Sequence, residues 1–130
     1  MTITPPSSGG PEAYWRAQLA AGHFMLQRAK LSGRIFFPPR VAEPGTGDDD
    51  LEWIEACGLG TIYSLTIVNQ KPPTPSYNVV LIDLDEDARL MSRIDHVDIE
   101  KLHVGMRVQA QIIEEHGSAL LVFVPIGPSA

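Results

Sequence analysis

Hydrophobic and polar residues alternate along the second half of the chain with the period of two that is typical of half-buried β-strands. In the segment 60–69, this alternation places Tyr63, Leu65 and Ile67 on one face and Ile62 on the other. The same pattern predicts four further strands, over 77–84, 89–94, from Gly105 to the turn that begins at Glu114, and over 119–124.

Polar turns and one short helical turn separate the predicted strands. A proline-rich loop occupies 71–76, three acidic residues form a turn at 85–87, and a single helical turn is predicted around 98–102. Five strands with a helical turn between the third and the fourth follow the order of an OB-fold barrel. We therefore predict a mainly β chain with an OB-fold domain over 54–127.

The first half of the chain has a different pattern. Residues 1–10 are predicted to form a flexible N-terminus. A helix follows, because Pro11 suits a first helical position and the residues up to Ala21 favour helices. Short strands are predicted over 23–28 and 35–37, with a loop over 41–50, so that 11–53 forms a helix and a small ribbon-like subdomain.

Length and charge restrict the function. The 130 residues suit one domain with an appended subdomain, and 44% of them are hydrophobic, which is enough for a buried core. The formal net charge of −6 argues against binding to nucleic acid phosphates, which depends on lysine and arginine. A single-stranded nucleic-acid-binding OB-fold module stays as the alternative hypothesis, because OB-folds often bind single strands.

Cysteine usage excludes two further classes of protein. The single cysteine, Cys57, allows neither an internal disulfide nor a cysteine-rich metal site.

We find no signal peptide pattern at the N-terminus, and the longest apolar stretch, 119–124, is far shorter than the roughly 20 residues of a membrane span. We therefore expect a cytoplasmic protein without membrane partners.

Several short motifs occur together in a family-like order. They are an aromatic-Trp helix at 13–15, "QR" at 27–28, "FPPR" at 37–40, "LEW" at 51–53, "GLGTIYS" at 58–64 and "RLMSRI" at 89–94. In this order and spacing, the chain resembles the zinc-ribbon/OB-fold family once named domain of unknown function thirty-five. The resemblance extends over about 11–126.

The resemblance implies a rubredoxin-like ribbon before the barrel, with one CxxC pair after the first strand and a second after "PPR". These four ligand positions fall on Ala29, Ser32, Glu43 and Thr46. Structural zinc requires cysteine or histidine ligands at such positions. We therefore expect a degenerate ribbon without zinc, which is held by packing of aromatic and proline residues or by a partner protein.

The resemblance also implies a role. Members of this family are usually small subunits that bind or position acyl-CoA and scaffold a catalytic partner. That partner is a thiolase, a thiolase-like aldolase, an acyltransferase or a hydratase. The expected function is thus a non-catalytic accessory subunit, with acyl-CoA as a ligand, no bound cofactor and no catalytic residue.

Two groups of residues are candidates for CoA binding or for the partner interface. The first is the basic group Arg28, Lys30, Arg34 and Arg40, which either receives the phosphates of CoA or forms a solvated face that balances nearby aspartates. The second is the aromatic group Phe36, Phe37, Trp53 and Tyr63, which either forms a wall for an adenine or acyl group or belongs to the core and an interface.

A third hypothesis is a self-contained enzyme that acts on a thioester through Cys57 or His96. A catalytic cysteine needs a neighbouring histidine or helix N-terminus, and the sequence around Cys57 has no histidine. His96 with Asp95 and Asp98 lies on one short loop, for which an exposed connection is the better interpretation.

Overall fold

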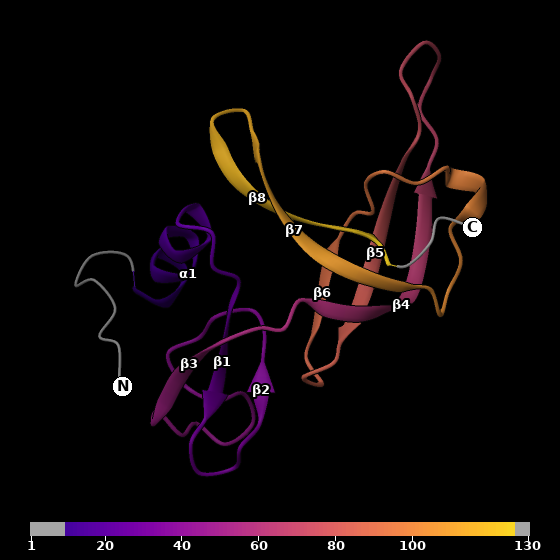
Figure 1. Cartoon of the computed structure of the whole chain (residues 1–130). Coiled ribbons are helices and arrows are strands. Elements are labelled where there is room, and N and C mark those ends of the chain that lie inside the picture. Colours follow the sequence, from indigo (N-terminus) through magenta and orange to yellow (C-terminus); the bar gives the residue numbers. More distant parts are fainter. Residues whose placement is uncertain (1–9, 127–130) are drawn as a thin grey trace.

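A computed structural model describes residues 10–126, which fold into one α-helix, one short 3-10 helix and two antiparallel sheets (Figure 1). Most of the segment predicted to be flexible, 1–10, lies outside the described residues. Its last residue, Gly10, begins helix α1 (Gly10–Ala20). The helix buries Tyr14 and Leu19 and ends before Gly22, whose φ of 93° suits glycine, so the helix prediction is confirmed to within one residue.

The ribbon is a sheet of three short strands in the order β2-β1-β3. The central strand β1 (Met25–Ala29) pairs with β2 (Ile35–Phe36) and with β3 (Leu51–Glu55). The first two strands were expected, whereas β3 was not. It runs through residue 53, where the sequence pattern suggested the boundary between the two subdomains.

The second sheet curls into the predicted barrel. Its strands are β4 (Leu59–Val68), β5 (Tyr77–Leu84), β6 (Arg89–Ser92), β7 (Arg107–Glu115) and β8 (Ser118–Pro125), in the order β6-β5-β4-β7-β8. A parallel bridge between Ile94 and Phe123 closes the barrel. The short 3-10 helix η1 (Ile99–Lys101) lies between β6 and β7, so the OB-fold prediction is confirmed.

A β-bulge corrects the predicted faces of β4. The pairing of β4 with β5 shifts between Ile62 and Ser64, so that Tyr63 is an extra residue. This insertion returns Ile62 to the core side together with Leu65 and Ile67, while Tyr63 is exposed. The prediction that Tyr63 shares a face with Leu65 and Ile67 is therefore wrong, because strict alternation does not hold across a bulge.

The helix, the ribbon and the barrel share one hydrophobic core. Leu19 of α1 and Phe24 and Leu26 at β1 belong to the same buried cluster as the barrel residues. The Phe24 and Phe123 rings meet edge to face, with centroids 6.5 Å apart. Because the ribbon contributes to this core, it packs against the barrel and does not depend on its own small interior.

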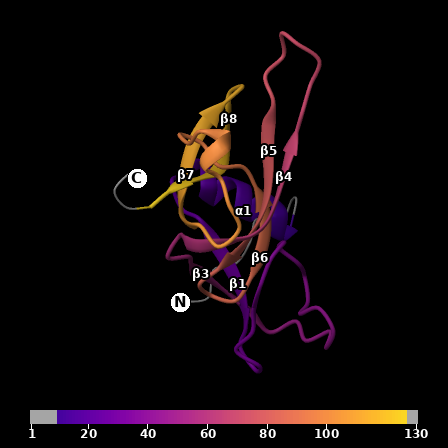
Figure 2. The same ribbon diagram turned by 90° about the vertical axis from the view of Figure 1, so that its right-hand side faces the viewer.

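The β4–β5 hairpin projects beyond the rest of the barrel in both views (Figures 1 and 2). Its two strands stay paired as far as Val68 and Tyr77, at the base of the proline-rich loop. Within the described residues, no helix is long and apolar enough to cross a membrane.

Candidate functional site

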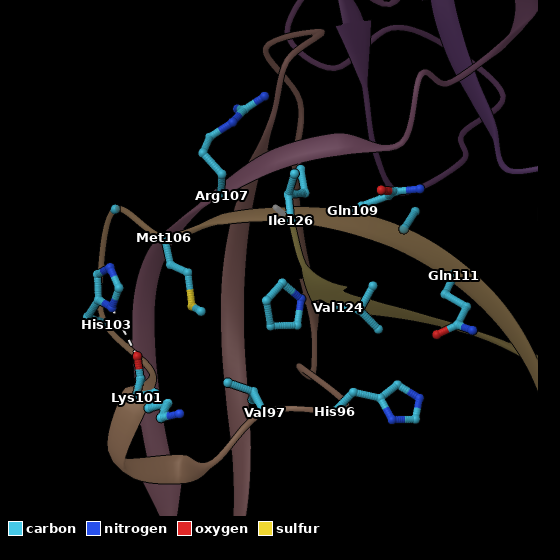
Figure 3. A pocket seen from close by; sticks show the side chains of 13 residues that line it. His96, Val97, Lys101, His103, Met106, Arg107, Gln109, Gln111, Val124 and Ile126 are labelled. Carbon is cyan, nitrogen blue, oxygen red and sulfur yellow. Dashed lines mark hydrogen bonds between the residues drawn. The ribbon is translucent and has the colours of Figure 1, made fainter. Parts of the chain in front are cut away.

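A pocket lies on the barrel, beside the loop that joins β6 to β7. It has a volume of about 740 Å³ and is formed by that loop, the start of β7 and the end of β8 (Figure 3). Its apolar lining comes mainly from Val97, Met106, Ala110, Val124, Pro125 and Ile126. Its polar lining comes from His96, Lys101, His103, Arg107, Gln109 and Gln111.

The charge of this pocket differs from the charge of the chain. None of the described residues that line it is an aspartate or a glutamate, although the chain carries a net charge of −6. Lys101 lies on its rim, with Nζ 3.9 Å from a carboxylate oxygen of Asp98. The neighbouring His103 places Nδ1 3.0 Å from the Lys101 carbonyl oxygen (Figure 3). An apolar floor with a cationic rim suits an elongated ligand that combines anionic and apolar groups.

A bidentate ion pair holds Arg107 at the edge of the pocket. Its guanidinium donates to both carboxylate oxygens of Asp85, over 2.7 and 2.9 Å, and to the Thr61 hydroxyl over 3.0 Å. These hydrogen bonds lower the pKa of the Asp85 carboxyl and raise the pKa of Arg107. Arg107 therefore supports the wall of the pocket and points away from its centre (Figure 3).

Substitution of Arg107 by an uncharged residue should change the titration of Asp85. In Arg107→Gln, we expect the pKa of Asp85 to rise toward its ordinary value of about 3.9. In the parent, the pKa of Asp85 is lower in the folded state than in the unfolded state. The Asp85–Arg107 pair therefore stabilises the fold at pH values above the ordinary pKa of an aspartate, and this stabilisation is lost as the pH falls through the lowered pKa. NMR titration of the carboxyl carbon measures both values, and Lys101→Gln in the same pocket is the control. An unchanged Asp85 titration in Arg107→Gln would contradict this assignment.

Three of the four basic side chains of the ribbon, those of Arg28, Lys30 and Arg34, have partners within the chain. Arg28 pairs with Glu52 on the neighbouring strand, and Lys30 lies 3.6 Å from a carboxylate oxygen of Asp50. Arg34 Nη1 donates to the Pro44 carbonyl over 2.7 Å. The backbone of Arg40 exchanges two hydrogen bonds with the Gln27 side chain, over 2.6 and 2.7 Å. Their contact with CoA phosphates stays a prediction.

The aromatic candidates mostly pack within the chain. Phe36 is buried, Phe37 meets Trp15 with ring centroids 5.4 Å apart, and Trp53 meets Tyr14 at 4.7 Å. Tyr63 is different, because half of its surface is exposed and the Arg89 guanidinium lies 3.6 Å from its ring centroid. Phe37 and Trp53 therefore pack against helix α1, whereas Tyr63 lies on the barrel strand β4.

Seven of the eight candidates lie in the ribbon and Tyr63 lies on the barrel strand β4. None of them lines the pocket on the barrel, which was not predicted. A signal for it was present in the segment 101–107, where a lysine, a histidine and an arginine occur in an otherwise acidic chain. Gln109 and Gln111 continue this polar side along β7. The residues after β6 and at the end of β8 complete the pocket, and their contribution could not be inferred from this pattern.

Cys57 and His96 lie in separate places. Cys57 is exposed, and its backbone N–H donates to a Glu86 carboxylate oxygen over 2.7 Å. His96 lies on the pocket wall with a φ of 59°. Within residues 10–126, no group of three or more His, Cys, Asp or Glu is placed to hold a metal ion.

Comparisons with known proteins agree with this architecture. The family described as "ChsH2, C-terminal OB-fold domain" matches residues 53–112. One chain of a solved structure described as "Ltp2-ChsH2(DUF35) aldolase" superposes with a TM-score of 0.80 at 27% identity, covering 92% of this chain and 98% of that chain. The fold is thus that of an OB-fold protein with an N-terminal ribbon.

Two curated relatives show which kinds of protein this chain is similar to in sequence. A "Probable enoyl-CoA hydratase alpha subunit" from Thermomonospora curvata is 30% identical over 128 residues, which cover 95% of this chain and 40% of that protein. A "DUF35 domain-containing scaffold protein" from Methanocaldococcus jannaschii is 30% identical over 88 residues, covering 64% of this chain and 62% of that protein. The chain therefore spans less than two thirds of these relatives. Its sequence and fold are similar to those of the DUF35 family of OB-fold proteins.

Proposed function

We propose that the chain acts as a non-catalytic accessory unit that scaffolds an acyl-CoA-processing enzyme. The observation that carries this proposal is the superposition with one chain of the aldolase structure described above, which extends over 98% of that chain. The names of the relatives, a hydratase alpha subunit and a scaffold protein, point to the same type of role. The proposed partner is a thiolase-like enzyme or a hydratase.

We further propose acyl-CoA as the ligand that this unit helps to position. The barrel pocket supports this choice, because its rim carries Lys101 and His103 and its floor carries Met106 and Val124. CoA thioesters combine phosphates with a long, mostly uncharged arm and an acyl chain. A cationic rim suits the phosphates, and an apolar floor suits the remainder.

Co-purification tests the scaffold proposal. The tagged full chain should be expressed together with the genes that neighbour its own, and the bound proteins should be identified by mass spectrometry. We expect one larger acyl-CoA-processing protein in a constant ratio to the tagged chain. Recovery of the tagged chain without such a protein would contradict the proposal.

Calorimetry with CoA tests the ligand proposal separately. In the complex, we expect Lys101→Glu to weaken CoA binding about tenfold, because charge reversal on the rim removes one favourable contact with phosphate and adds a repulsive one. Lys71→Glu, in the exposed loop of the β4–β5 hairpin, is the matched control and should leave the affinity unchanged. Equal affinities of parent and Lys101→Glu would exclude this pocket as the CoA site.

A further inference from the structure

Two turns of the ribbon, 29–34 and 43–48, repeat one pattern of hydrogen bonds. In each turn, the amide of the first residue donates to the carbonyl of the sixth, over 2.9 Å in the first turn and 2.7 Å in the second. The fifth residue is a glycine with a φ of 75° in both turns, and its amide donates to the carbonyl of the first residue. The amide of the sixth residue donates to the hydroxyl of the fourth over 3.2 Å in both turns. The two turns are therefore equivalent in backbone geometry.

A buried carboxylate joins these two turns. Glu43, the first residue of the second turn, is only 4% exposed. One of its carboxylate oxygens accepts a 2.8 Å hydrogen bond from the Ser32 hydroxyl of the first turn. The other accepts a 2.8 Å hydrogen bond from the Thr46 hydroxyl of its own turn. Both carboxylate oxygens thus have donors, as a buried charged group requires.

The side chains at this place do not fit a zinc ion. The first and fourth residues of the two turns are the positions where the family resemblance places cysteines. Here they supply a fully buried alanine methyl group, two hydroxyls and one carboxylate, which lack the sulfur and imidazole ligands of structural zinc. Each hydroxyl is already used twice, because it donates to Glu43 and accepts from a backbone amide.

We infer that the Glu43 carboxylate, with the Ser32 and Thr46 hydroxyls, pins the two ribbon turns together in place of a metal ion. Hydrogen bonds to a charged acceptor are stronger than those between neutral groups, and loss of the carboxylate would leave both hydroxyls without their acceptor. A second contact crosses between the turns, because Arg34 of the first donates to the Pro44 carbonyl of the second over 2.7 Å. This inference does not depend on the proposed scaffold function.

Amide hydrogen exchange of the full chain tests the inference. We expect Glu43→Ala to raise the exchange rates of the Gly33 and Gly47 amides about tenfold or more, while the core amides of the barrel keep their rates. Glu43→Gln retains one acceptor oxygen and should give a smaller increase. Glu114→Ala, an exposed position on β7, is the control and should leave both glycine amides unchanged.

Milder variants keep the test decisive if Glu43→Ala does not fold. Ser32→Ala and Thr46→Ala each remove one hydroxyl donor, so each should raise the exchange of both glycine amides by a few-fold. Glycine exchange rates that equal those of the parent in these variants would overturn the inference. So would one equivalent of zinc per purified chain, or a rise in the same exchange rates when the parent is treated with a chelator.

Discussion

Phe123→Ala is expected to lower the free energy of unfolding by about 3–5 kcal/mol, which is a large part of the stability of a small domain. Phe123 is fully buried and lies where the barrel closes. Its backbone amide donates to the Arg93 carbonyl over 3.1 Å, and its carbonyl accepts from the Asp95 amide over 2.8 Å. Its ring also meets Phe24 of the ribbon side, so truncation should loosen both sheets together.

Urea denaturation monitored by two probes measures this effect. Both tryptophans, Trp15 and Trp53, lie in the N-terminal half, so their fluorescence reports on the helix and the ribbon. Far-ultraviolet circular dichroism reports mainly on the barrel strands. Because the core is continuous, we expect the two transitions to coincide in the parent and to shift together in Phe123→Ala. Separate transitions would contradict a shared core.

Two controls accompany this variant. Phe123→Leu keeps most of the buried volume and should cost less than about 1.5 kcal/mol. Met91→Ala removes a side chain that is 68% exposed, so its effect should lie within about 0.5 kcal/mol. A loss in Met91→Ala that matches the loss in Phe123→Ala would argue against the placement of the core.

Gly60→Ala should destabilise the barrel by about 2–3 kcal/mol through overpacking. Gly60 pairs with Leu84 of β5 on one side and with Val108 of β7 on the other. A Cβ atom at this position would lie 2.6 Å from a methyl group of Ile82 and 2.9 Å from the Asp83 carbonyl oxygen. The carbonyl belongs to the backbone, so the clash cannot be relieved by a side-chain rotation alone.

Gly117→Ala is the matched control for Gly60→Ala. A Cβ atom on Gly117 would meet no heavy atom within 4 Å, so this variant has only the cost of its φ of 79°. That cost is about 1–2 kcal/mol for a residue other than glycine. Urea midpoints compare the two variants, and a smaller loss in Gly60→Ala than in Gly117→Ala would contradict the close strand packing at Gly60.

The barrel could be predicted from the sequence because its strands follow a regular alternation. The predicted segment 77–84 coincides with β5, and the helical turn around 98–102 contains η1. The bulge at Tyr63 and the strand β3 could not be predicted in this way. A bulge interrupts the period of two, and β3 is a short segment with partly buried residues on both faces.

The sites were harder to predict because they are assembled from distant segments. The family resemblance placed the four expected zinc-ligand positions on Ala29, Ser32, Glu43 and Thr46, which do not supply the cysteine or histidine ligands of structural zinc. It could not show that three of them bind one another, because that depends on how two separate turns meet. The pocket likewise combines a loop after β6 with the end of β8, which are more than twenty residues apart in the sequence.

Reconstitution with the co-purified partner tests the proposed scaffold function of this chain. The acyl-CoA-dependent activity should be measured for the partner alone, for this chain alone and for the two together. We expect no turnover by this chain alone, and a higher activity of the two together than of the partner alone. Activity of this chain by itself, or a partner whose activity and CoA affinity are the same with and without it, would contradict the scaffold function.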